Sequence, residues 1–172
     1  MSLLQVAALL IFPALVIAGA VTDLASFTIP NRLNLALAAA YPLVALAVGR
    51  PLPEIGFALA IGFGALVIAV GMFAAGWIGG GDAKLFAAAA LWLGWPASVS
   101  FVMVTALAGG ALALLLLNVR AAWLKPYLAG APGWLARLTT KDEAVPYGVA
   151  IALGALIAYP QSPLLSGLHA SF

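Results

Sequence analysis

Long uninterrupted apolar runs are the feature of this 172-residue chain that most restricts its fold. Hydrophobic residues make up 66% of the sequence, and it holds only seven Lys or Arg and five Asp or Glu residues. Soluble domains carry about 25% charged residues, so these few charges cannot cover a water-facing surface. The sequence therefore excludes a soluble enzyme, a disordered chain and a nucleic-acid-binding protein, and it predicts a polytopic membrane protein embedded in a lipid bilayer.

The apolar runs favour an all-α fold over a β-barrel, whose strands would alternate apolar and polar residues. A membrane span needs about 20 residues, so the chain predicts about six transmembrane helices in a single domain over residues 1–172. The runs cover residues 3–22, 33–49, 55–77, 85–95, 97–118 and 145–165. Asp23 ends the first run, and Gly94-Trp95-Pro96 ends the short fourth one. The polar stretch 119–144 predicts a loop that anchors the protein at the membrane surface, and the alternative is a cover over a site that faces the cytoplasm.

The Lys and Arg residues predict the orientation, because cytoplasmic loops carry an excess of both. If the N-terminus lies outside and six spans alternate, the exterior segments hold only Arg50. The cytoplasmic segments then hold Arg32, Lys84, Arg120, Lys125, Arg137 and Lys141. We therefore expect both termini outside. The first run resembles a secretory signal near Ala18-Gly19-Ala20, but it lacks a basic start and exceeds the usual length of about 7–15 residues, so we expect it to remain as a span.

Asp23 and Asp82 are the acidic residues that adjoin apolar runs. The other acids lie in turns or loops: Glu54, Asp142 and Glu143. A helix from Asp82 to Trp95 would span about 21 Å, against a hydrocarbon core of about 30 Å. Asp82 is therefore expected below the cytoplasmic surface of the membrane, on the same side as Asp23. The glycines at 79–81 would allow the backbone to approach closely at this depth.

Two carboxyls that face one hydrated cavity can hydrolyse an amide bond. Like charges a few ångströms apart do not both ionise easily, so one carboxyl keeps a proton to donate while the other takes a proton from water. This chemistry uses no metal or cofactor, and we expect neither in a chain that has no Cys and one His. The structural alternatives are that Asp23 ends a helix, that Asp82 caps a helix starting at Ala83, and that Lys84 reaches the membrane surface.

Three short motifs resemble those of type IV prepilin peptidases. Asp23-Leu-Ala-Ser-Phe-Thr-Ile-Pro-Asn-Arg-Leu-Asn34 is similar to the family's first aspartate motif, in which Pro and Asn follow the span. Gly79-Gly80-Gly81-Asp82-Ala83-Lys84 is similar to its GxGD motif with the following Lys. Val145-Pro146-Tyr147-Gly148 is similar to the start of its last span. The three motifs occur in the family's order and cover most of the chain.

The resemblance implies a GxGD-type aspartyl membrane endopeptidase with Asp23 and Asp82 as the catalytic pair. The residues that it implies as structural parts of the motifs are Pro30, Asn31, Gly79, Gly81, Lys84, Pro146 and Gly148. The implied substrate is a pilin precursor, with a basic leader and an apolar helix, cut at the cytoplasmic face of a prokaryotic inner (plasma) membrane.

Larger members of this family add a cytoplasmic domain with paired Cys-x-x-Cys motifs that methylates the new terminus. Here only about ten residues separate the first two spans, and no Cys is present. The chain is thus similar to the small peptidase-only members that serve Flp/Tad-type pili, and to archaeal preflagellin peptidases. Asp142 and Glu143 are weaker candidates for binding the basic leader, and small residues such as Gly62, Gly64 and Ala65 would leave room for the apolar helix.

Two other functions remain open at this point. A presenilin-like GxGD protease would share Asp82 but needs a Pro-Ala-Leu motif near the last span, and the chain has that tripeptide only in the first run, at 13–15. A small ion- or proton-coupled transporter could use the same two aspartates, because intramembrane acids often mark ion paths. Against the transporter, the chain shows no inverted repeat.

Overall fold

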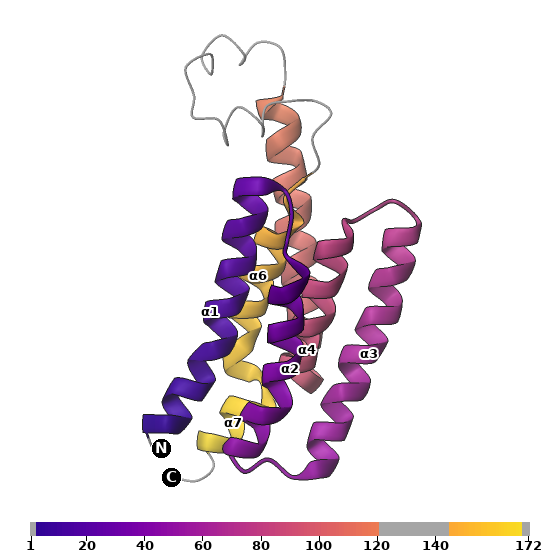
Figure 1. The fold of residues 1–172 in the computed structure, drawn as a ribbon. Coiled ribbons are helices and arrows are strands. Elements are labelled where there is room, and N and C mark those ends of the chain that lie inside the picture. The colour runs from indigo at the N-terminus through magenta and orange to yellow at the C-terminus, as the bar shows by residue number, and fades with distance from the viewer. Residues whose placement is uncertain (1–2, 121–144, 170–172) are drawn as a thin grey trace.

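A bundle of helices makes up the described part of the chain, residues 3–120 and 145–169 of a computed structural model. The longer helices are α1 (Leu3–Ser26), α2 (Asn31–Ala47), α3 (Leu52–Ala74) and α4 (Gly80–Val119). The last part comprises α6 (Tyr147–Ala158), the 3₁₀ turn η2 (Tyr159–Gln161) and α7 (Pro163–His169). The axes run along one common direction, and α3 stands at one edge of the bundle, where it packs on α4 (Figure 1).

Helix α4 is a hairpin of two helical halves. Inside it, Gly94 has φ 58° and ψ −160°, and Trp95 has φ −103° and ψ 140°, so neither residue is helical. A positive φ costs glycine little, because glycine lacks a Cβ. The rings of Phe86 and Phe101 stack with centroids 4.9 Å apart, which shows that residues 80–93 and 96–119 lie side by side in opposite directions. The predicted break at Gly94-Trp95-Pro96 is thus confirmed.

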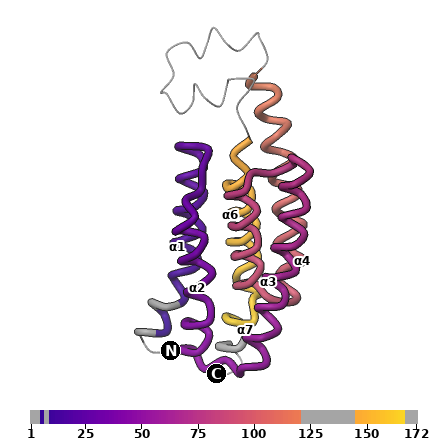
Figure 2. The backbone as a smooth tube through the Cα atoms, turned by 45° about the vertical axis from the view of Figure 1, so that its right-hand side comes forward, coloured from indigo at the N-terminus to yellow at the C-terminus, as the bar shows by residue number. Residues whose placement is uncertain are grey.

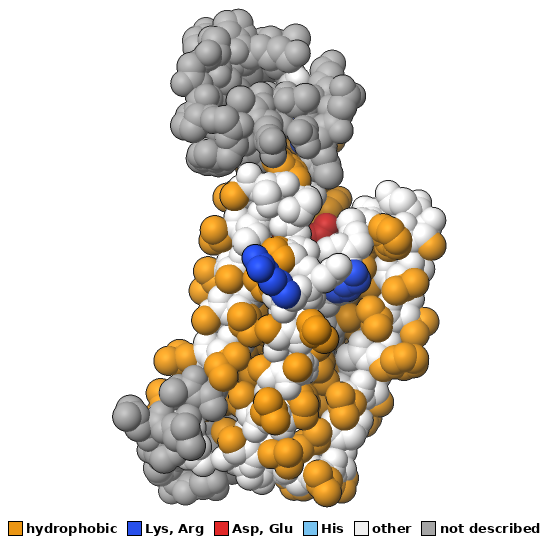
Figure 3. Space-filling model, viewed as in Figure 1, with side chains coloured by type: hydrophobic (Ala, Val, Ile, Leu, Met, Phe, Trp, Pro, Cys, Tyr) orange, Lys and Arg blue, Asp and Glu red, His pale blue; other side chains and the backbone are white. Residues whose placement is uncertain are grey.

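Four segments are long and apolar enough to cross a membrane: Leu9–Ser26, Leu52–Ala74, Gly80–Val119 and Tyr147–Ser166. The 17 residues of α2 are fewer than such a segment needs. Hydrophobic side chains cover much of the outer surface of the helices (Figure 3). A polytopic, all-α integral membrane protein is therefore confirmed for the described residues, whereas the count of six crossings and the outside location of both ends stay predictions.

The two ends of the bundle differ in what they contain. Helix α1 begins and α7 ends at one end, together with the connection between α2 and α3 (Figure 2). The connections that follow α1 and α3 lie at the opposite end (Figures 1 and 2). Asp23, Arg32 and Lys84 belong to this second end, whereas Arg50 belongs to the first.

Several helix boundaries differ from the apolar runs. The first helix does not end at Asp23 but continues to Ser26. Two hydroxyls near this end bond back to helical carbonyls, Thr22 Oγ1 to Gly19 O at 2.9 Å and Ser26 Oγ to Thr22 O at 2.7 Å. The third helix begins and ends three residues before its run, at Leu52 and Ala74. Proline starts α2, since the Pro30 carbonyl accepts the N–H of Leu33 at 2.9 Å.

A cluster of aromatic side chains forms the centre of the core. Phe12 of α1 contacts Trp92 of α4 and Tyr159 of η2, with ring centroids 5.2 and 4.5 Å apart. The polar tips of the cluster are satisfied by backbone carbonyls, because Trp92 Nε1 donates to Leu37 O at 2.7 Å and the Tyr159 hydroxyl donates to Leu9 O at 2.9 Å. The cluster thereby fixes α1, α2, α4 and η2 relative to one another.

Candidate active site

Asp23 lies in the last turns of α1 with its carboxyl inside the bundle. Its side chain is 4% exposed, and its Oδ2 accepts the backbone N–H of Gly148 at 2.7 Å. That N–H belongs to the first turn of α6, where helical amides have no partner within the helix. The carboxyl of α1 therefore satisfies the start of α6, and this bond joins residues that are 125 positions apart in the chain.

Asp82 lies in the first turn of α4 and faces the same region. It is 7% exposed, and among the described residues its Oδ1 has no hydrogen-bond partner. The Asp82 carboxyl interacts electrostatically with Asp23 and with the amides of Gly79 and Gly148. The two aspartates are thus neighbours, and the Gly148 amide lies within reach of both. The alternative that Asp82 caps a helix starting at Ala83 is wrong, because α4 begins at Gly80 and Gly79 is its N-cap residue.

Glycine allows three close approaches around the pair. A Cβ on Gly148 would lie 2.8 Å from Asp23 Oδ2, and a Cβ on Gly79 would lie 2.9 Å from Asp82 Oδ2. A Cβ on Gly81 would lie 3.2 Å from the Ile29 Cβ and 3.3 Å from its backbone nitrogen. At each of these positions a side chain would collide with a neighbouring motif residue. The absence of a Cβ in glycine therefore allows the motif residues to come into contact.

Two polar bonds join the start of α2 to the start of α4. Asn34 Nδ2 donates to the Gly81 carbonyl at 3.1 Å, and Lys84 Nζ donates to Asn31 Oδ1 at 2.7 Å. Lys84 is thus more than a group that reaches the membrane surface, because it links two of the motifs. Asn34 is 4% exposed and was not among the predicted site residues, although it closes the first motif. A buried amide in an otherwise apolar helix is the signal that could have identified it.

The prolines of the motifs set where α2 and α6 begin. Pro30 is the N-cap residue of α2, with φ −60° and ψ 134°, and Pro146 is the fully buried N-cap residue of α6. By starting α6 next to α1, Pro146 places the Gly148 amide against Asp23. The first two motifs and the last one thus meet at one end of the bundle.

The residues predicted to contact the substrate do not lie beside the two aspartates in the described part of the structure. Asp142 and Glu143 lie outside the described residues. Gly62 leaves no room for a substrate helix, because a Cβ there would lie 2.7 Å from Leu91 Cβ of α4, whereas Gly64 has open space. Within the described residues, no group of three or more His, Asp or Glu side chains could hold a metal ion.

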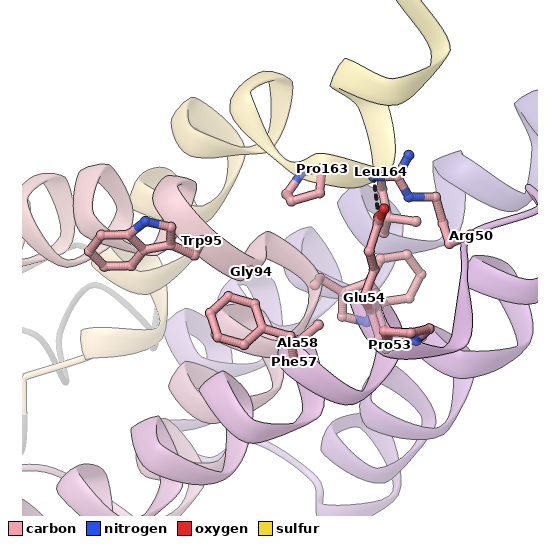
Figure 4. Close-up of a pocket in the computed structure, with 11 residues that line it drawn as sticks. Arg50, Pro53, Glu54, Phe57, Ala58, Gly94, Trp95, Pro163 and Leu164 are labelled. Atoms are coloured by element: carbon pink, nitrogen blue, oxygen red, sulfur yellow. Dashed lines mark ion pairs between the residues drawn. The ribbon is translucent and has the colours of Figure 1, made fainter.

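A separate pocket of about 440 Å³ lies at the opposite end of the bundle and does not include the aspartates. Arg50 and Glu54 form an ion pair of 2.7 Å at this pocket, and Trp95 and Pro163 belong to its lining (Figure 4). The ion pair joins Arg50, which precedes α3, to Glu54 in the first turn of that helix.

Comparison with known families agrees with the family resemblance of the sequence. The model of the type IV leader peptidase family matches residues 10–114, a range that includes Asp23, Asp82 and the glycines before Asp82, and that ends before Pro146. Comparisons with curated proteins and with solved structures returned no match. The family match gives no support to the transporter alternative.

Proposed function

We propose that this chain, which belongs to the type IV leader peptidase family, removes the leader of a pilin precursor with Asp23 and Asp82 as paired catalytic carboxyls. Membership of the family makes it a peptidase with pilin precursors as the implied substrate. The observation that carries the proposal is the bond from the Gly148 amide to Asp23 at 2.7 Å, with the Asp82 carboxyl beside it. This arrangement brings three separate motifs together around two buried carboxyls.

In the proposed mechanism one carboxyl donates a hydrogen bond to the scissile carbonyl and the other takes a proton from the attacking water. The water oxygen then bonds to the carbonyl carbon, the C–N bond breaks, and the leaving amine receives a proton from the pair. The Gly148 N–H bonds directly to Asp23, which suits a carboxylate, while the Asp82 Oδ1 is free to donate. We therefore assign Asp23 as the base and Asp82 as the acid.

The proposal also covers the face of the membrane at which the site lies and the type of pilus that the substrate builds. We place the site at the cytoplasmic face of a prokaryotic inner membrane, because Arg32 and Lys84 lie at the end of the bundle that holds the aspartates. The connection between α1 and α2 spans only residues 27–30, which leaves no space there for a methyltransferase domain. This short connection favours a single peptidase domain over residues 1–172 that acts on Flp/Tad-type precursors.

An apolar groove beside the site could hold the apolar helix of the precursor. The groove has a volume of about 790 Å³ and runs between α3, α4 and α6, with Gly64 and Ala65 on one wall. Its lining includes Tyr147, the neighbour of Gly148. A helix in this groove would present the peptide bond at its end to the two carboxyls. Asp142 and Glu143 remain the proposed partners of the basic leader.

The test is to co-express the protein with candidate pilin precursors and then to measure the intact mass of the pilin by mass spectrometry. The wild-type protein should remove the mass of the leader, whereas Asp23→Asn and Asp82→Asn should each leave the precursor uncut while reaching the membrane in normal amount. Glu54→Gln is the matched control, since Glu54 is an acid at the opposite end of the bundle and should leave processing unchanged. Normal processing by either aspartate variant would contradict the proposal.

A further inference from the structure

A second groove, of about 710 Å³, opens between α2, α3 and α4. Most of its lining is apolar and includes Leu35, Ala38, Phe63, Leu66 and Leu91. The remaining lining residues are polar or cationic, and all of them come from the first turns of α2 and α4: Asn31, Arg32, Asn34 and Lys84. The groove is therefore amphipathic along its length, with its polar part at the end of the bundle that holds the aspartates.

The polar part of this groove carries positive charge without an acid among its lining residues. Lys84 Nζ bonds to Asn31 Oδ1 at 2.7 Å, which leaves two of its three N–H donors for other partners. Arg32 is exposed, and the described part of the chain gives its guanidinium no polar partner. On this face, Lys and Arg side chains lie at two places among hydrophobic side chains, with one Asp or Glu side chain close above them (Figure 3). The starts of two helices add further positive potential there.

Asn34 lines the polar part of the groove and links α2 to α4. Its side chain is 4% exposed and lines the groove, and its Nδ2 is held by the Gly81 carbonyl at 3.1 Å. Its Oδ1 is buried and has no partner in residues 3–120 and 145–169. Because this oxygen is closed to a group the size of water, Asn34 contributes its side-chain surface to the groove and the link to α4, and its Oδ1 is not offered to an occupant.

We propose that this groove binds one anionic phospholipid, such as a phosphatidylglycerol. The phosphate lies against Arg32 and Lys84, and one acyl chain follows the apolar wall between α2 and α3. An amphipathic groove at the level of the headgroups matches a lipid better than a free phosphate, because the phosphate would leave the apolar wall in contact with water. The proposal does not depend on peptidase activity.

The bound lipid would also reinforce the join between the first two motifs. Asn34 and Lys84 hold the starts of α2 and α4 together, and Asp82 lies between their contact points on α4. A headgroup bridging Arg32 and Lys84 adds a third link across the same two helices. We expect the anionic lipid to raise the thermal stability of the protein.

The test is native mass spectrometry of the purified protein in detergent, titrated with phosphatidylglycerol or with phosphatidylcholine of the same acyl chains. The wild-type protein should bind phosphatidylglycerol more tightly. Each basic residue near an anionic lipid contributes about fivefold in affinity, so Arg32→Gln should weaken phosphatidylglycerol binding about fivefold, and Arg32→Gln/Lys84→Gln roughly 25-fold. Arg32→Gln breaks no described hydrogen bond, which keeps the test valid if the double variant is unstable.

Two controls make the result specific to the groove. Arg50→Gln removes a cation at the other end of the bundle and should keep the preference for phosphatidylglycerol. Ala38→Trp fills the groove and should weaken lipid binding at least tenfold, whereas Ala36→Trp, on the same helix but outside the lining, should not. Equal binding of the two lipids, an equal effect of Arg50→Gln and Arg32→Gln, or normal binding by Ala38→Trp would overturn the proposal.

Discussion

Gly148→Ala tests whether the contact between α6 and Asp23 controls the site. The added Cβ would lie 2.8 Å from Asp23 Oδ2, 2.9 Å from its Cβ and 3.0 Å from its Cγ. Carbon atoms normally pack about 3.5–4.0 Å apart, so the carboxyl or α6 must move by roughly 1 Å. Gly148 lies inside a helix and its φ is not positive, so alanine itself fits the local backbone. Steric contact with Asp23 is therefore the main effect of the substitution.

The size of the effect follows from that displacement. Overpacking of this kind costs about 1–3 kcal/mol in free energy of unfolding, and a stretched hydrogen bond to a charged group adds about 1 kcal/mol. At about 2–4 °C for each kcal/mol, the apparent Tm should fall by roughly 4–16 °C. A displacement of about 1 Å in a catalytic group costs about 100-fold in rate, so leader removal should slow far more than the loss of stability explains.

The assay combines the apparent Tm in detergent with the rate of leader removal in proteoliposomes. Gly71→Ala is the matched control, because a Cβ there meets nothing within 4 Å and alanine favours a helix. It should keep the wild-type rate and hold or raise the Tm. If Gly148→Ala processed the precursor at the wild-type rate and unfolded at the wild-type temperature, the proposed geometry around Asp23 would be refuted.

Three further substitutions test other contacts. Asn34→Leu keeps a side chain branched at Cγ but is larger and removes the donor to the Gly81 carbonyl at 3.1 Å, so the free energy of unfolding should fall by about 1–3 kcal/mol while leader removal falls about tenfold; an unchanged rate would remove Asn34 from the positioning of Asp82. Gly62→Ala places a Cβ 2.7 Å from Leu91 Cβ and should cost about 1–3 kcal/mol in thermal unfolding, whereas Gly64→Ala, which meets open space, should cost nothing; equal stabilities would contradict the packing of α3 on α4. Asp142→Asn/Glu143→Gln should raise the KM for a precursor with a basic leader and leave the KM for a neutral leader unchanged, and an equal KM for both leaders would end the docking proposal.

The apolar runs predict the described helices well because burial in lipid acts on each segment separately. Each span must satisfy its own backbone groups, so its length and composition are visible in the sequence. The reversal at Gly94 was predictable from local sequence as well, since Gly94 and Pro96, with one residue between them, interrupt an apolar run. The end of α1 was missed because Thr22, Asp23 and Ser26 look like the end of a span. The hydroxyls of Thr22 and Ser26 instead bond inside the helix, and the carboxyl of Asp23 bonds to Gly148 of α6.

The contacts of the candidate site depend on pairing between distant segments, which local patterns do not contain. The motif resemblance selected Gly148, but nothing in its own neighbourhood predicts a bond to Asp23. Asn34 and Gly81 are likewise joined only by the packing of α2 on α4. The sequence therefore predicts which residues make up the candidate site. Their hydrogen-bond partners become known only from the arrangement of the helices.

The most direct test of the central claim is the rate of leader removal by four purified proteins in the same proteoliposomes. These are the wild-type protein, Asp23→Asn, Asp82→Asn and the double variant. Two carboxyls that act as one unit predict a loss of at least about 1,000-fold in each single variant and no further loss in the double variant, because such effects are not additive. A single variant within tenfold of the wild-type rate would contradict the claim, as would a double variant that loses the product of the two single effects.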